Sequence, residues 1–493
     1  MLNLGQILGS GIFSVPGVVL DSVSSVGLSL SFWAISPIFA LFALLSYTEL
    51  ASYFPRRSGA EVVFLEQAYP RPRFFVPTTF AITTVLLSFS AANSVVFAQH
   101  ALSLFNLPIT GFNQTMLAVG VTTFSVSVVA ISTKWSLRAV NVFGIFKVLS
   151  LGFVAVTGVA VLTGFTRISD PFANFQNFWK GSTTNLNALS TALVKTNYAY
   201  IGWSNAFNVL GEVDGISPVR TVRNAGFISL GIVTALFLTV NFAYIAAIPL
   251  DDIKRAGQLV GVLFFERVFG THWTSKILPV LVALSCVGNT CLTLSQTVGQ
   301  ARVLREVARQ GLLPYPTFFA STRPFGTPLG PVALQYAITT LVICVLPARE
   351  AFNFLVDLVS YPPMVFNVAT ATGLWLYRTR RANEGLSKSP FQVWNVVVAL
   401  WLLQCIFLLV MPWVPPEDGH ADVSFWYATY CVVGIALLLL CGLYYYVWIV
   451  LLPNIGGYEF VEEVVDLGGG AFTSRLVRKY KASMPEEHPL LGS

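Results

Sequence analysis

The sequence predicts an all-α membrane protein of about twelve transmembrane helices, built as two inverted five-helix halves followed by two further helices. Three observations support this prediction: the scarcity of charge, a series of apolar runs, and an interruption in two of those runs. Of the 493 residues, 55% are hydrophobic and only 11% are charged, whereas soluble proteins carry about 25% charged residues. The basic residues behind the net charge of +6 lie at the ends of apolar runs. They therefore indicate membrane topology and not nucleic-acid binding.

Most of the apolar runs approach the roughly 20 residues that a helix needs to cross a bilayer. The loops that this count places on the side of the N-terminus hold more than twice as many Lys and Arg residues as the opposite loops. Such a bias predicts that both termini are cytoplasmic. The expected spans are 1–20, 27–52, 74–104, 116–132, 139–164, 187–213, 224–249, 276–304, 329–347, 351–377, 391–413 and 423–452.

Gly9, Ser10 and Gly11 interrupt the first apolar run, and Pro16 follows within about a turn. Each glycine weakens a helix by about 1 kcal/mol. Because lipid offers no hydrogen bonds, the backbone groups freed by such a break need partners. The break is therefore either a packing defect or a place that binds a ligand through its backbone. Since only eight residues precede it, we expect the first half-helix to be short.

A second interruption, at Tyr198–Asn205, contains Gly202 and lies in the sixth run. Interrupted helices in matching positions of two halves point to the substrate site of a transporter. An odd number of helices in each half gives the halves opposite orientations in the membrane. The expected organisation is a first repeat over 1–164, a second over 187–377, helices 11 and 12 over 391–452, and a cytoplasmic tail over 453–493.

Two connecting segments mix charged and apolar residues and are too polar to span a bilayer. Residues 54–69 follow the second span, and residues 301–311 follow the eighth. We expect each to form a short amphipathic helix on the inner membrane surface.

All six cysteines lie in apolar segments, where they are expected to be buried like small apolar residues. The chain carries no cluster of His, Cys or carboxylate residues with metal-ligand spacing and no nucleotide-binding P-loop. It also lacks a Ser/His or His/Asp constellation typical of an integral-membrane enzyme. We therefore expect neither a metal nor a cofactor, and no enzymatic activity.

Several motifs resemble those of a known family. These motifs are Gly9-Ser-Gly-Ile-Phe13, Pro55-Arg-Arg-Ser-Gly59, Tyr200-Ile-Gly-Trp203 and Gly311-Leu-Leu-Pro314. They resemble motifs of the amino acid–polyamine–organocation superfamily, and within it those of the L-type amino acid transporter branch. Fungal high-affinity methionine permeases look similar at Ser94-Val-Val-Phe97, Lys134-Trp135 and Ser360-Tyr-Pro362. The resemblance covers nearly the whole chain. It implies a leucine-transporter-like fold with discontinuous helices 1 and 6, and a multi-pass protein of the plasma membrane.

The resemblance also implies that the interrupted helices bind an amino acid zwitterion. The backbone N–H groups of Ser10, Gly11 and Ile12 would bind its carboxylate at the positive end of a half-helix. The carbonyl oxygens of Ile7, Tyr198 and Ile201 would accept hydrogen bonds from its ammonium group. Gly9 and Gly202 would provide the breaks, Tyr198 would be an aromatic gate, and Trp203 and Asn205 would line the pocket. The alternative is that the glycines only permit close helix packing and that the aromatic residues belong to the core.

Lys147 is the most informative charged residue, because it lies inside the expected fifth span. A lysine at membrane depth is costly and is a functional candidate by default. In the resembled superfamily a lysine here can replace the sodium ion of sodium-coupled relatives, near helices 1 and 8. We expect it to load and release a proton, with Ser285 and Asn289 of helix 8 completing the region that it faces. The alternatives are a static tether to helix 1 carbonyl groups and extension of the side chain toward the cytoplasm.

Together these features predict a secondary active transporter that imports neutral L-amino acids, with methionine as the expected substrate. It would work by alternating access, with a proton as the coupling ion. One alternative is a carrier of the same fold for a polyamine, choline or γ-aminobutyrate. Another is a sensor that binds an amino acid without transporting it. Animal L-type transporters pair with a heavy chain through a cysteine in the second outer loop, and residues 105–115 contain none. We therefore expect no disulfide-linked heavy chain; the partners are the small-molecule substrate and the lipid bilayer.

Overall fold

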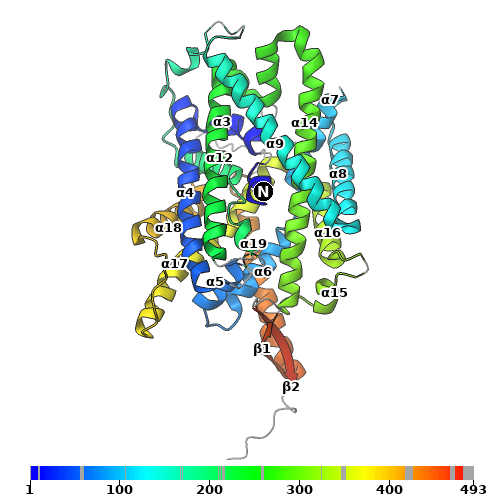
Figure 1. Ribbon diagram of the computed structural model, residues 1–493, viewed down its shortest axis with the longest axis vertical. Coiled ribbons are helices and arrows are strands. Elements are labelled where there is room, and N and C mark those ends of the chain that lie inside the picture. Colours follow the sequence, from blue (N-terminus) through cyan, green and yellow to red (C-terminus); the bar gives the residue numbers. More distant parts are fainter. Residues whose placement is uncertain are drawn as a thin grey trace, which may run out of the picture.

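A computed structural model gives the fold of the protein as a bundle of helices from which a C-terminal hairpin projects (Figure 1). The helices run mainly along the long axis of the molecule, and the N-terminus lies in the middle of the bundle. The structure describes residues 2–8, 11–55, 60–105, 107–166, 168, 170–208, 210, 213, 217–256, 260–323, 325–345, 351–416, 426–466 and 472–480.

The N-terminal third of the chain forms the first nine helices. The first expected span is divided, and its second part, α2 with α3, is continuous in its hydrogen bonding, because the Val15 amide donates to Gly11 and the Val19 amide donates to Val15. These helices are α1 (Leu2–Ile7), α2 (Gly11–Ser14), α3 (Pro16–Val23), α4 (Val26–Tyr53), α5 (Ala60–Ala68), α6 (Phe75–Leu86), α7 (Ala91–Leu104), α8 (Gly111–Ile131) and α9 (Thr133–Leu162).

The middle of the chain begins with a short 3-10 turn (Ala173–Phe175) and contains the second divided helix. Its longest element, α14, changes direction at Gly270, where φ is 71°, a value that glycine adopts without strain. The helices are α10 (Leu186–Ala199), α11 (Asn205–Asn208), α12 (Pro218–Ala247), α13 (Leu250–Arg255), α14 (Val260–Arg309), α15 (Pro316–Ala320) and α16 (Leu329–Val345).

The C-terminal part adds three long helices and an antiparallel hairpin. The hairpin is held to the bundle by a hydrogen bond from the Leu476 amide to the Gln310 carbonyl of 2.9 Å, and it packs Tyr458 and Phe460 against α14 and α19 residues. The elements are α17 (Ala351–Asn383), α18 (Asn395–Val410), a 3-10 turn (Met411–Trp413), α19 (Thr429–Tyr445), a π-helical turn (Tyr446–Leu451), α20 (Leu452–Gly456), β1 (Tyr458–Asp466) and β2 (Phe472–Tyr480).

The largest apolar core surrounds the two divided helices. Trp33 of α4 packs edge-on against Phe237 of α12, and Tyr200 contacts both rings. Around the α1–α3 segment, α12 and α9 pack against α1, whereas α10 and α4 pack against α3. Between the described residues, α9 also packs against α14 and α1.

Eight helices of the described part are long and apolar enough to cross a membrane. They correspond to the second to fifth, seventh and tenth to twelfth expected spans. The third span consists of α6 and α7 in succession. The first and sixth spans are also divided, the ninth is α16 with 17 residues, and the eighth lies within α14. The expectation of a multi-pass helical protein is thus confirmed.

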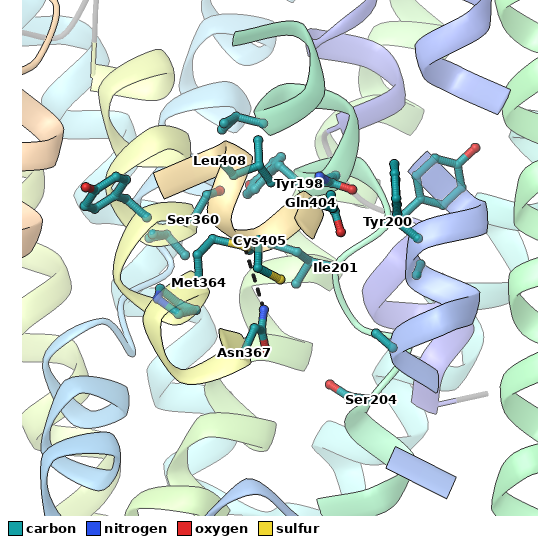
Figure 2. Close-up of a pocket in the computed structure, with 18 of the residues that line it drawn as sticks. Tyr198, Tyr200, Ile201, Ser204, Ser360, Met364, Asn367, Gln404, Cys405 and Leu408 are labelled. Carbon is teal, nitrogen blue, oxygen red and sulfur yellow. Dashed lines mark hydrogen bonds between the residues drawn. The ribbon is translucent and has the colours of Figure 1, made fainter. Parts of the chain in front are cut away.

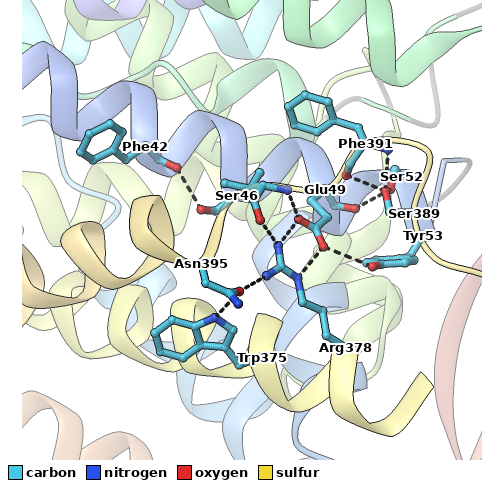
Figure 3. Close-up of polar contacts among 11 residues, drawn as sticks. Phe42, Ser46, Glu49, Ser52, Tyr53, Trp375, Arg378, Ser389, Phe391 and Asn395 are labelled. Atoms are coloured by element: carbon cyan, nitrogen blue, oxygen red, sulfur yellow. Dashed lines mark hydrogen bonds and ion pairs between the residues drawn. The ribbon is translucent and has the colours of Figure 1, made fainter. Parts of the chain in front are cut away.

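A buried ion pair fastens one end of α4 to α17 and to the beginning of α18. Arg378 of α17 donates from Nε to Oε1 of Glu49 over 2.7 Å, and its Nη2 also binds Glu49. The Val393 amide, two residues before α18, donates to the same carboxylate over 2.7 Å, and Asn395 accepts from Arg378. Glu49 is 0% exposed. Both oxygens of its buried carboxylate accept hydrogen bonds within this network (Figure 3).

Four details differ from the sequence expectation. Within residues 54–69, the short helix α5 packs among α4, α6 and α17 with most of its apolar side chains buried, so its apolar residues face other helices. Residues 301–311 mostly continue α14 and do not form a separate helix. The tail contains a β-hairpin, so the chain is not all-α. Among the described cysteines, Cys344 is exposed.

Candidate functional site

The two divided helices touch each other at their interruptions. A Cβ added to Gly11 would lie 2.8 Å from Cα of Ala199, the last residue of α10. A Cβ added to Gly202 would lie 2.9 Å from the Gln6 side chain and 3.2 Å from the Ile7 backbone nitrogen. Only glycine allows both approaches. The first divided helix therefore lies against the second at two points, Gly11 with Ala199 and Ile7 with Gly202.

Asn3 ties the first divided helix to the second. Its Nδ2 donates to the Trp203 carbonyl over 2.9 Å, and its Oδ1 accepts from the Ala206 amide over 3.0 Å. Asn3 is buried. It thereby satisfies two backbone groups that the interruption at Gly202 releases, which is what a break in a membrane helix requires.

The chain between α10 and α11 is a series of tight turns. The Ile201 amide donates to the Tyr198 carbonyl over 3.1 Å, and the Asn205 amide donates to the Gly202 carbonyl over 3.3 Å. Gly202 has φ of 116°, a conformation that side chains rarely adopt. The Tyr198 carbonyl is thus already a hydrogen-bond acceptor for the turn that follows α10.

Gly9 and Ser10 lie outside the described residues, so the structure does not place them. Ile7 and Ile12 are both buried. Gly11 and Ile12 form the first turn of the segment that runs to Val23, where N–H groups have no intrahelical partner. The geometry thus brings the expected carboxylate side, at Gly11 and Ile12, next to the end of α10.

A cavity of about 240 Å³ adjoins the second interruption, between α4, α10, α17 and α18. Of the residues that the sequence analysis placed near the second interruption, Tyr198, Ile201, Gly202 and Trp203 line this cavity, whereas Asn205 is not among its lining residues. Figure 2 shows Tyr198, Gln404, Met364 and Ser360 around the same space. Its wall combines aromatic rings, a thioether and amide groups, which suits a mostly apolar ligand with a few polar groups.

Two carboxyl residues, Asp357 and Glu61, also line this cavity. Asp357 of α17 pairs with Lys195 of α10 at 3.0 Å, and Lys195 also donates to the Asn353 carbonyl over 3.1 Å. Lys195 is 0% exposed. The second carboxyl group is that of Glu61 on α5. The signal for both was present in the sequence as charge within, or next to, an apolar run.

Lys147 lies on α9 and is 6% exposed. The helix α9 contacts both α1 and α14, so the lysine sits on the element expected to face helices 1 and 8. Ser285 and Asn289 belong to α14, but their side chains lie outside what the structure describes.

This architecture defines a class of protein: a multi-pass helical membrane protein with two interrupted helices in contact beside an apolar cavity. Residues 1–438 match the family model described as amino acid permease, and the chain belongs to this family. The high-affinity methionine permease of Saccharomyces cerevisiae is 30% identical over 97% of this chain and 83% of its own length. The low-affinity methionine permease of the same yeast is 26% identical over 97% and 86%. The human b(0,+)-type amino acid transporter 1 is 28% identical over 90% and 85%.

Proposed function

We propose that this permease is a secondary active importer of neutral L-amino acids, with methionine as the preferred substrate. It works by alternating access and is driven by protons. The observation that carries the proposal is the contact between the two interruptions, where Gly11 meets Ala199 and Gly202 meets Ile7. Such discontinuous helices expose half-helix ends of opposite polarity, which match the two charges of an amino acid.

In this proposal the substrate carboxylate binds the N–H groups at Ser10, Gly11 and Ile12, and the ammonium group binds the carbonyl oxygens of Ile7, Tyr198 and Ile201. These groups read what all amino acids share, so the side-chain pocket determines selectivity. The methionine permease relatives support methionine as the preferred substrate. The cavity agrees, because Met364, Trp203 and Tyr198 offer apolar and aromatic surface and sulfur contacts aromatic rings favourably.

We further propose twelve spans in a 5+5 inverted repeat, a position in the plasma membrane with cytoplasmic termini, and no disulfide-linked heavy chain. Lys147 has two roles open to it: it binds and releases the coupling proton, or it is a static tether to α1. Its burial on α9 beside α1 supports either role.

A carrier of polyamine or choline would need negative charge facing its ligand. Asp357 lines the cavity but is neutralised by Lys195 at 3.0 Å. This pairing removes Asp357 as the negative charge for a cationic ligand; the other carboxyl group in the cavity wall is that of Glu61.

The test is uptake of radiolabelled methionine by cells that lack their own permeases, at acidic and at neutral pH, with unlabelled amino acids, spermidine, choline and γ-aminobutyrate as competitors. We expect uptake that rises in acid and is reduced by methionine and other neutral amino acids alone. Competition by spermidine or choline would contradict the proposed cargo. Binding of methionine without uptake, at normal surface levels, would indicate a sensor.

A further inference from the structure

A carboxyl group lies in the wall of the cavity that adjoins the interruption of α10 and α11. Glu61, the second residue of α5, is half-buried and lines this cavity together with Tyr47 of α4 and Trp203. The Tyr47 hydroxyl group interacts with the Glu61 carboxyl group across this wall. The helix α5 itself is fixed between α4, α6 and α17, so the carboxyl group is held in place by the fold.

The other buried carboxylates near the cavity have cationic partners. Asp357 pairs with Lys195 at 3.0 Å, and Glu49 pairs with Arg378 over 2.7 Å. For Glu61, the side-chain partner that the described part of the protein provides is a neutral hydroxyl group. A buried carboxylate beside a neutral donor gains a proton more readily than one beside a cation.

The groups around Glu61 come from each element packed on α5. From α4 they are Tyr47 and, nearer the end of the helix, the Glu49–Arg378 pair; from α18, Cys405 lines the same cavity. From α17, Thr370 hydrogen-bonds Tyr47, and Arg380 is engaged by the carbonyl groups of Gln67 and Ala68. The helix α6 carries no titratable residue. Glu66 lies further along α5, and Arg56 and Arg57 precede α5 outside the described residues.

Burial raises the pKa of the Glu61 carboxyl group above its ordinary value, although its hydrogen bonds to its own backbone and to Tyr47 oppose this rise. The group therefore changes its charge at a pH closer to neutrality than an exposed glutamate would. The titrating carboxyl group therefore lies in the wall of the cavity beside the interruption between α10 and α11, which moves in the proposed transport cycle.

A short chain of contacts joins Glu61 to both interrupted helices. Tyr47 interacts with Glu61 and packs edge-on against Trp203, with ring centroids 4.9 Å apart. The Trp203 carbonyl in turn accepts the 2.9 Å hydrogen bond from Asn3 of α1. Tyr47 is fully enclosed, since it also packs against Phe64, Phe207 and Trp401. If protonation of Glu61 shifts the Tyr47 side chain, the shift changes the packing of Trp203 at the interruption between α10 and α11.

We propose that Glu61 is a proton-binding site of this permease, and that its protonation is coupled through Tyr47 and Trp203 to the position of the interrupted helices. A proton from water on one side of the membrane binds a carboxylate oxygen of Glu61, and the same proton returns to water on the other side. No other bond forms or breaks. The inference rests on the proposed transport function and assigns Lys147 the role of static tether.

The experiment uses the purified full chain in proteoliposomes and records two signals: methionine counterflow without a pH gradient, and methionine-dependent acidification of the vesicle interior by a pH-sensitive dye. For Glu61→Gln we expect counterflow to persist within about threefold of wild type while proton influx is lost. Glu66→Gln is the matched control, because it removes the same charge from the same helix without altering the cavity wall; it should keep both signals.

Tyr47→Phe removes the hydroxyl group that favours the charged form of the Glu61 carboxyl group. We expect the midpoint of the pH profile of uptake to move by about one pH unit toward alkaline values. If Glu61→Gln fails to fold, Glu61→Asp serves instead: it should keep proton influx with a displaced midpoint.

Proton influx by Glu61→Gln equal to that of wild type would overturn the inference, as would an unchanged pH profile in Tyr47→Phe and Glu61→Asp alike. Loss of proton influx in Lys147→Met with retention in Glu61→Gln would overturn it in favour of the lysine. Absence of counterflow in folded wild-type protein would instead contradict the proposed transport function, so the two failures are distinguishable.

Discussion

Gly11 and Gly202 lie where the two interrupted helices are in direct contact. At Gly11 a methyl group would overlap Ala199, and at Gly202 it would overlap Gln6 in a backbone conformation with φ of 116°. These contacts explain the glycines as packing residues, whether or not a ligand binds next to them. A substitution at either position must therefore move the breaks relative to each other.

We predict that Gly202→Ala and Gly11→Ala each reduce methionine uptake by about five- to 150-fold, because misfit or strain at such sites costs about 1–3 kcal/mol. Gly120→Ala is the control, since nothing lies within 4 Å of the added methyl group; it should leave uptake unchanged. Uptake is normalised to the amount of protein at the cell surface. Equal uptake by all three variants would separate the glycines from transport.

At Lys147, substitution tells the two roles of this buried lysine apart. If the side chain is a tether beside α1, Lys147→Met reduces the rate of uptake but leaves its pH dependence intact. If it binds the coupling proton, the same variant takes up methionine equally at acidic and neutral pH. The measurement is the ratio of uptake at the two pH values, which does not depend on how much active protein is present. Our assignment of the proton to Glu61 predicts the first result.

At the scale of elements, the Glu49–Arg378 pair joins α4, α17 and the beginning of α18. Removing one partner of a buried pair leaves an uncompensated charge and typically costs about 3–5 kcal/mol. We predict that Arg378→Gln lowers the thermal unfolding midpoint of the purified protein markedly.

The matched control for this prediction is Arg267→Gln. Its pair with Asp252 at 2.8 Å is exposed, with the arginine side chain 52% accessible, and exposed pairs contribute about 0–1 kcal/mol. Unfolding is followed by the temperature dependence of monodispersity in detergent. Similar midpoints for the two variants would show that the buried pair does not hold these helices together.

The positions of most elements follow from apolar run length, because a helix that crosses lipid must be long and continuous in its hydrophobicity. Both helix interruptions were predictable from glycine at Gly9, Gly11 and Gly202. The break between α6 and α7 was not, since residues 87–90 contain neither glycine nor proline. There Ser88 bonds back to the Val85 carbonyl over 2.7 Å and the Ser90 amide donates to Thr339 over 3.4 Å. Such tertiary contacts cannot be seen in a local pattern.

The hairpin β1–β2 carried a local signal that the polar character of the tail obscured. Its strands are rich in Val, Tyr and Phe, and a Gly-rich segment separates them in the sequence, as is typical of a hairpin. In the candidate site, the glycines at which the two interrupted helices make contact, Gly11 and Gly202, were visible in the sequence. The cavity residues Glu61 and Tyr47 were not, because α5 reaches the cavity only through its packing on α4 and α17.

At the scale of the whole molecule, the two interruptions lie within the bundle and far from the projecting hairpin (Figure 1). The core around Trp33, Tyr200 and Phe237 surrounds them. This placement suits a site that opens alternately to either side, since small shifts of the half-helices can expose it without dismantling the surrounding helices.

The most direct test of the account is counterflow of radiolabelled methionine into proteoliposomes preloaded with unlabelled methionine, comparing wild type, Gly120→Ala and Gly202→Ala. Counterflow requires only that the loaded site alternates between the two sides, so it does not depend on a gradient of the coupling ion. We predict accumulation by wild type and Gly120→Ala and little by Gly202→Ala. No accumulation by folded wild-type protein, or equal accumulation by Gly202→Ala, would contradict a methionine site at the interrupted helices.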